Sequence, residues 1–197
     1  MNATFFERIG AYLIDAILIG VIASLICTTI PNKTEDLTKE MEELSEKMTQ
    51  NEITAQEYFE GYKELIYKQQ KSNVLENTVN VILTLGYFVV FQYMNKGQTI
   101  GKKLLKIKVV DKDTEKPTTV LKGLLRSIFT LSIASATLNI LFIFIFNKDS
   151  YIIGYLITTM IELLFVFITI IFIVYRKDRR GLHDIMANTK VIREGKW

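Results

Sequence analysis

The sequence predicts an all-α membrane protein with four transmembrane helices, an extracytoplasmic helical insert and a small cytoplasmic two-stranded element. Three observations lead to this prediction. Hydrophobic residues make up 49% of the 197 residues although 23% are charged, the apolar residues fall into four blocks, and the charges between the blocks separate by sign. The blocks cover residues 9–30, 74–94, 124–146 and 151–175. Each block is close to the roughly 20 residues that a helix needs to cross a bilayer.

We expect the first block to be retained as a membrane helix rather than cleaved as a signal peptide. No basic segment precedes it, Asp15 interrupts its apolar run, and no small-residue cleavage site precedes Pro31. The single cysteine, Cys27, lies inside this block, so we expect no disulfide within one chain. We interpret Cys27 as a small packing residue.

The charges between the blocks predict the orientation of the chain. Residues 95–123 carry eight Lys and three acidic residues, and residues 176–197 carry seven Lys or Arg and three acidic residues. Residues 32–73 carry ten acidic residues and six Lys. Because Lys and Arg accumulate in cytoplasmic loops, we expect the basic loop, the basic tail and both termini in the cytoplasm. The chain is then a multi-pass protein of the cell membrane, and its basic segments face the lipid bilayer rather than nucleic acid.

The acidic insert 32–73 is predicted to be helical. Apolar residues recur at helical spacing in its first half: Leu37, Met41, Leu44 and Met48. Thr54 and Glu57 form a capping-box pattern before a second apolar stripe. We expect a helical hairpin, or a helix that runs straight into the second span. Its apolar stripe either packs on itself and on the span ends or docks a partner outside the membrane.

The cytoplasmic segments are predicted to form a small sheet. Residues 106–110 alternate and are rich in β-branched side chains, residues 111–117 have turn composition, and residues 189–193 resemble a second strand. Because a lone two-stranded ribbon is marginal in water, we expect it to rest on the membrane or on an interfacial helix within residues 96–105.

Among the ionisable residues in or beside the predicted spans, the informative ones are Arg8, Asp15, Arg126 and Glu162. A carboxylate inside a spanning helix costs about 2.5–3.5 kcal/mol on insertion scales, so Asp15 requires a partner, a water-filled cavity or a proton. Arg8 precedes it by two helical turns and shares its face, and Arg126 approaches from the third span. Two interpretations stay open. Arg8, Asp15 and Arg126 form a structural ion pair, or Asp15 exchanges a proton with a cation.

Glu162 has no cationic partner in its own span. It is either protonated, because burial disfavours the charged form, or the second carboxylate of an ion path. In the third span, Ser132, Ser135 and Asn139 form a polar stripe that either packs against another helix or lines a polar cavity.

The chain lacks the residue patterns of the common catalytic and metal sites. His183 and Asp184 lie together at the predicted inner interface, but zinc sites use three or four ligands. No Ser-His-Asp set, phosphate-binding loop, zinc-protease motif or cysteine cluster occurs. We therefore expect no enzyme, no metal and no cofactor.

Three segments together resemble the RDD family of small integral membrane proteins. They are FERIGAYLID at residues 6–15, GQTIGKKLLKIKVV at 97–110 and RGLHDIMANTKVI at 180–192. The family takes its name from an arginine and two aspartates, which the resemblance places at Arg8, Asp15 and Asp184. The other motif positions are Gly97, Gln98, Gly101, Gly181 and His183.

The resemblance implies a membrane protein of one of two kinds, since some members look like cation/proton antiporters and others act as partners or inhibitors of membrane proteases. An antiporter would bind Na⁺ or H⁺ at Asp15 and Glu162, and four spans are few, so a homo-oligomer would complete the pathway. A regulatory or binding protein would recruit another membrane protein, such as a membrane protease, through residues 32–73 or the basic inner face.

Overall fold

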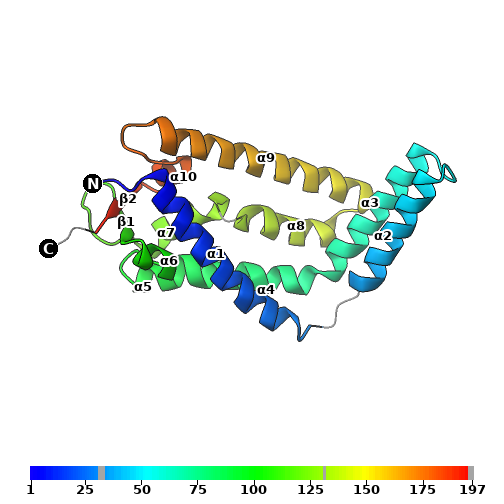
Figure 1. The fold of residues 1–197 in the computed structure, drawn as a ribbon, viewed down its shortest axis with the longest axis horizontal. Coiled ribbons are helices and arrows are strands. Elements are labelled where there is room, and N and C mark those ends of the chain that lie inside the picture. Colours follow the sequence, from blue (N-terminus) through cyan, green and yellow to red (C-terminus); the bar gives the residue numbers. More distant parts are fainter. Residues whose placement is uncertain (31–33, 131, 195–197) are drawn as a thin grey trace.

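The structure, a computed structural model, describes residues 1–30, 34–130 and 132–194. Long apolar helices lie side by side and form an elongated bundle (Figure 1). They are α1 (Phe5–Cys27), α4 (Val74–Leu85), α8 (Ile133–Ile145) and α9 (Lys148–Tyr175). One end of the bundle carries a two-stranded sheet and the N terminus, and the other carries a helical hairpin. We call these the sheet end and the hairpin end.

Within the described residues, three helical segments are long and apolar enough to cross a membrane: Phe5–Cys27, Val74–Met94 and Lys148–Tyr175. They correspond to three of the four predicted spans. The second of them runs through α4, a short π-helix η1 (Gly86–Phe91) and α5 (Gln92–Met94). The first of these helices begins at Phe5, before residue 9, where the predicted span starts. Thr4 caps α1, because its hydroxyl accepts a hydrogen bond from the Glu7 amide.

The predicted third span is not one straight helix. Its residues 124–146 are divided between α7 (Val120–Thr130) and α8, and the axes of Val120–Ile128 and Ile133–Ile145 differ by 70°. Ser132, just before α8, has a φ of 57°, which a right-handed helix cannot contain. Counted as one broken span, this pair gives up to four spans.

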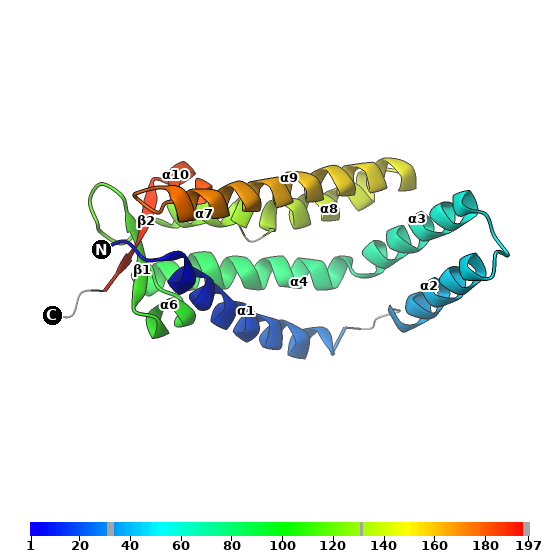
Figure 2. The ribbon, with the colours of Figure 1, turned by 45° about the horizontal axis from the view of Figure 1, so that its top comes forward.

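The acidic insert forms a helical hairpin of α2 (Thr34–Thr49) and α3 (Ala55–Ser72). The hairpin extends beyond the other helices (Figure 2). Its predicted capping box is present, since the Thr54 amide donates to Glu57 Oε2 at 2.8 Å and the Glu57 amide donates to the Thr54 hydroxyl at 3.2 Å. Only Asn73 separates α3 from α4, so the hairpin also leads almost directly into the second span.

The predicted sheet is confirmed. Strand β1 (Ile107–Asp111) pairs antiparallel with β2 (Thr189–Arg193), with Val109 opposite Val191. The start of the chain adds to this sheet, because the Ala3 amide donates to the Val191 carbonyl at 2.9 Å. Two short helices, α6 (Ile100–Leu104) and α10 (Leu182–Met186), lie beside it.

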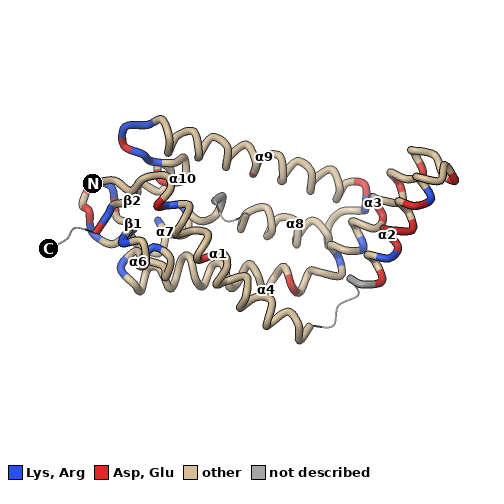
Figure 3. Tube along the Cα trace, in the orientation of Figure 1, with Lys and Arg blue, Asp and Glu red and all other residues tan. Residues whose placement is uncertain are grey.

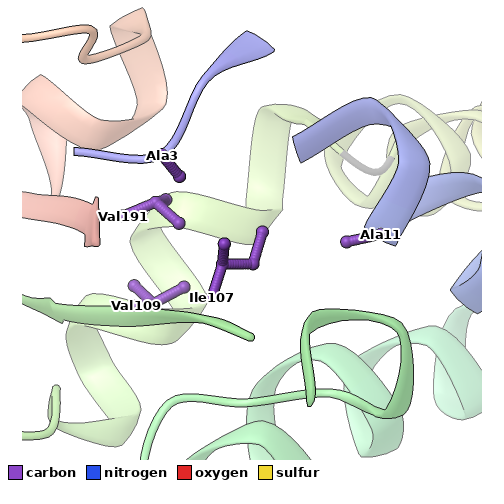
Figure 4. Close-up of a cluster of buried hydrophobic side chains, with 5 residues drawn as sticks. All are labelled: Ala3, Ala11, Ile107, Val109 and Val191. Atoms are coloured by element: carbon purple, nitrogen blue, oxygen red, sulfur yellow. The ribbon is translucent and has the colours of Figure 1, made fainter. Parts of the chain in front are cut away.

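A buried apolar cluster joins the sheet to α1. It consists of Ala3, Ala11, Ile107, Val109 and Val191, each at most 1% exposed (Figure 4). At about 25 cal/mol per Å² of buried apolar surface, this packing supplies the support that a two-stranded ribbon lacks by itself. The cluster therefore fixes the sheet against the end of the first span.

Charged residues are concentrated at the two ends of the bundle (Figure 3). Lys and Arg gather at the sheet end, and the hairpin carries many Asp and Glu. Between them the helices carry few charged residues. Many large apolar side chains there are exposed, such as Leu163, Leu164 and Phe167 of α9. An exposed apolar surface of this extent is typical of contact with lipid.

Candidate functional site

Asp15 is fully buried in α1 and accepts three hydrogen bonds from the described residues. Its Oδ1 accepts from the Tyr87 hydroxyl at 2.6 Å and from the Gly101 amide at 2.7 Å. Its Oδ2 accepts from the Thr99 hydroxyl at 2.5 Å. Neutral donors thus satisfy the carboxylate, and it connects α1 to η1 and to the start of α6.

The motif glycines explain how these donors reach Asp15. A Cβ atom at Gly101 would lie 2.2 Å from the Ala11 carbonyl oxygen, so only glycine lets α6 approach α1 this closely. Gly97 has a φ of 91°, and a Cβ there would lie 2.0 Å from the Val109 carbonyl oxygen. Gln98 fixes the same loop by donating from Nε2 to the Ile107 carbonyl at 3.0 Å. These three motif residues therefore build the loop that presents Thr99 and Gly101.

Asp184, rather than Asp15, is the partner of both arginines. Its Oδ2 lies 2.6 Å from Arg8 Nη1, and its Oδ1 accepts a hydrogen bond from Arg126 Nη1. The Gly181 amide and the Thr189 hydroxyl also donate to it, each at 3.2 Å. Asp184 therefore ties α1, α7, α10 and β2 together at the sheet end.

Of the two interpretations left open for Asp15, the ion pair with Arg8 and Arg126 is therefore not the one that the described contacts form, because both arginines pair with Asp184. Side chains on a helix tilt toward its N-terminal end, so Arg8 extends toward the sheet end, where α10 lies, and away from Asp15. The polar atoms of Asp15 are already engaged by Tyr87, Thr99 and Gly101.

The surroundings of Asp184 stabilise its charged form. Burial by itself raises the pKa of this carboxyl, but the charges of Arg126 and Arg8 outweigh burial and hold the pKa below its ordinary value. The Asp184 side chain has no exposed surface, and those of Arg8 and Arg126 are 9% and 13% exposed. This is a buried ion pair with two cations on one carboxylate.

His183 is buried beside this ion pair, with Nε2 3.6 Å from Asp184 Oδ2. Burial lowers the pKa of His183, the charge of Asp184 offsets this only in part, and the resulting pKa is about 3. The imidazole is therefore neutral near pH 7. Gly181 leaves room for it, since a Cβ there would lie 2.8 Å from His183 Cε1. Among the described residues, no three His, Cys, Asp or Glu are grouped as metal ligands.

A cavity of about 580 Å³ lies between α1 and α9, with α6, α7 and α10 at its sheet end. Its polar wall includes Arg8, Asp15, Lys102, Arg126, Glu162 and His183. Its apolar wall includes Phe5, Leu13, Phe88, Phe165 and Ile173. The cavity thus brings five of the sequence-predicted site residues to one place.

Glu162 lies near the middle of α9, roughly 21 Å from the start of the helix at 1.5 Å per residue. Its two carboxylate oxygens accept hydrogen bonds from the hydroxyls of Ser132 and Ser135. Two members of the predicted polar stripe therefore face Glu162. Asn139 of the same stripe accepts from the Thr158 hydroxyl at 3.2 Å and joins α8 to α9.

Lys102 is a cavity residue that sequence reasoning missed. Its Nζ donates to Gln92 Oε1 and lies 5.7 Å from the centre of the Phe88 ring. Burial, and next the charge of Arg126, lower the pKa of Lys102 to about 7. In the sequence it is one of eight Lys in a basic loop, and only its place directly after Gly101 sets it apart.

The RDD family model matches residues 2–188, nearly the whole chain. The match includes Arg8, Asp15 and Asp184. No curated protein and no solved structure matches the chain.

Proposed function

This chain belongs to the RDD family, and we propose that it exchanges protons for a monovalent cation such as Na⁺, with Glu162 as the exchanging group. One observation supports this most directly. Glu162, near the middle of a candidate membrane span, lines a cavity of about 580 Å³. An ionisable group at such a depth is rare outside ion and proton pathways.

The chemistry around Glu162 supports cation exchange. Hard cations prefer oxygen ligands, and the carboxylate lies beside the hydroxyl oxygens of Ser132 and Ser135. A bound cation and a bound proton each neutralise the carboxylate, so the two compete for one site. Asp15 differs, because three neutral donors occupy it. The proposal therefore rests on Glu162 alone and treats Asp15 as a structural residue.

The pathway is inferred from the charges. The Lys- and Arg-rich sheet end faces the cytoplasm by the positive-inside rule, which makes the protein multi-pass in the cell membrane with both termini inside. The cavity then leads from the cytoplasmic side to the membrane interior. The break between α7 and α8 adjoins Glu162 through Ser132, and broken helices of this kind line ion sites in transporters. A homo-oligomer would complete the path to the other side.

Proteoliposomes that contain the purified full chain test the proposal. A pH gradient is imposed, and Na⁺, K⁺ or choline is added while an enclosed dye reports pH. We expect Na⁺ or K⁺, but not choline, to drive proton flux. We expect E162Q to reduce the flux at least about tenfold and the matched variant E52Q, on the exposed hairpin loop, to leave it unchanged. Flux equal to that of empty vesicles, or full flux in E162Q, would refute the proposal.

The hairpin supports a second function, as a regulatory or binding partner of another membrane protein such as a protease. The hairpin extends beyond the bundle (Figure 2). Its Phe59 side chain is 63% exposed. An exposed aromatic residue on an acidic, projecting element is typical of a protein contact. Cross-linking in native membranes, with and without residues 35–70, tests this. Identical cross-linked partners from both forms would rule it out.

A further inference from the structure

We infer that the sheet-end half of the cavity is a binding site for an anionic membrane lipid, with the phosphate headgroup at Arg8 and Lys102 and an acyl chain between α1 and α9. The site lies in the same cavity as Glu162 but uses other side chains. Three observations lead to it: unsatisfied buried donors, the composition of the cavity wall, and the lack of close packing between α1 and α9.

The unsatisfied donors lie on the wall of this cavity. Arg8 is 91% buried, and its Nε and Nη2 have no hydrogen-bond partner among the described residues, although Nη1 pairs with Asp184. Thr169 Oγ1 and His183 Nδ1, which line the same cavity, are likewise buried without a partner in the described part of the chain. A buried donor without an acceptor costs about 1–3 kcal/mol, more when it is charged. A phosphate provides several acceptor oxygens for such donors.

The charges favour an anion over a cation at this end. Arg8, Lys102 and Arg126 line the cavity. Against them stand two carboxylates: Asp184, which pairs with both arginines, and Asp15, whose oxygens accept from neutral donors. Among the described residues neither carboxylate forms an ion pair with Lys102, whose Nζ donates to Gln92. A phosphate would supply the missing acceptor for Arg8 and a counter-charge for Lys102.

The apolar part of the wall favours a lipid over free phosphate. Ile9 and Leu13 of α1 face the cavity from one side, and Phe165, Ile170 and Ile173 of α9 from the other. The exposed fractions of Ile9, Leu13 and Ile170 are 39%, 55% and 39%, so neighbouring helices cover these side chains only in part. An apolar cleft of this kind beside buried cationic groups fits an acyl chain with an anionic headgroup.

Native mass spectrometry of the delipidated full chain in detergent tests the inference. We expect phosphatidylglycerol to bind at least about tenfold more tightly than phosphatidylcholine. K102Q should remove most of this preference, whereas K103Q, its exposed neighbour on α6, should retain it. The variant I170W fills the cleft without changing a charged residue, so it should weaken the binding of both lipids. It keeps the test valid if K102Q fails to fold.

Each alternative occupant gives a distinct result. Equal binding of the two lipids overturns the inference, as does a preference that K102Q and K103Q affect equally. Inorganic phosphate that binds alone and displaces phosphatidylglycerol at equal concentration would show a free anion site and overturn the lipid assignment. E162Q should keep the preference for phosphatidylglycerol. The lipid inference therefore stands if the proposed cation exchange fails, and the proposed cation exchange stands if the lipid inference fails.

Discussion

Removal of the charge on Asp184 should destabilise the protein strongly. The variant D184N keeps the shape of the side chain but leaves Arg8 and Arg126, 9% and 13% exposed, without a counter-charge. Loss of one partner of a buried ion pair costs about 3–5 kcal/mol. Asparagine can still accept hydrogen bonds at one oxygen, so we expect the loss in unfolding free energy to lie within this range rather than above it.

The assay is unfolding by sodium dodecyl sulfate in mixed micelles, followed by far-ultraviolet circular dichroism. The matched control is D178N, which breaks a surface pair with Arg176 on the same segment. Exposed pairs contribute about 0–1 kcal/mol, so the control should differ little from the wild type. If D184N and D178N agree to within about 1 kcal/mol, Asp184 does not hold the arginines, and the description of the sheet end is wrong.

The pH dependence gives the same prediction a second measurement. Because the folded-state pKa of Asp184 lies below its ordinary value of about 3.9, the charged carboxylate stabilises the folded state fully above that pH. Stability is then lost as the pH falls below about 4 toward the folded-state pKa. D184N should lack this acid-dependent loss.

Three further predictions use the same unfolding assay. D15N should lower the unfolding free energy by about 1–3 kcal/mol, because an amide cannot accept from all three donors, and it should keep cation-driven flux within about twofold of the wild type. G101A should cost about 1–3 kcal/mol through overlap with the Ala11 carbonyl, whereas G20A, which meets nothing within 4 Å, should be neutral. His183 has a folded-state pKa of about 3, so unfolding takes up a proton between pH 3 and 6.5. Stability should therefore fall by up to about 1.4 kcal/mol per unit as the pH drops through that window, and H183Q should remove this slope. Loss of cation-driven flux in D15N would contradict the structural role of Asp15. A G101A variant as stable as the wild type would contradict the close approach of α6 to α1, and a pH slope that persists in H183Q would contradict the burial of a neutral His183.

The regular elements follow from local patterns and could be predicted from the sequence. The strands at residues 107–111 and 189–193, the hairpin with its capping box at Thr54, and three of the spans all rest on periodicity within short windows. The break before α8 could not be predicted in this way. Ser132 adopts a left-handed conformation in an apolar run that contains neither glycine nor proline, so no residue type marks the position.

The sequence identifies most residues of the candidate site, though not Lys102, but it does not identify their partners. Proximity along one helix favoured Arg8 as the partner of Asp15. The donors to Asp15 come instead from residues 72, 84 and 86 positions away, which only the packing of α6 and η1 brings together. The approach depends on Gly101, whose role is visible only when the distance to Ala11 is known. A motif position can therefore be recognised in the sequence while the contact that requires it cannot.

The carboxylates of Asp184, Asp15 and Glu162 differ in whether their partners can both donate and accept hydrogen bonds. This difference assigns their roles. Asp184 is held by two guanidinium groups, which donate and never accept, so its protonation would remove the negative charge that faces both of them. Asp15 Oδ1 accepts hydrogen bonds from the Gly101 amide and from the Tyr87 hydroxyl. The backbone amide can only donate, so it cannot accept a hydrogen bond from a protonated Asp15. Glu162 is held by two serine hydroxyls, which rotate and can accept as readily as they donate. Gain or loss of a proton at Glu162 therefore leaves no donor or acceptor stranded, which is the property that an exchanging carboxylate requires.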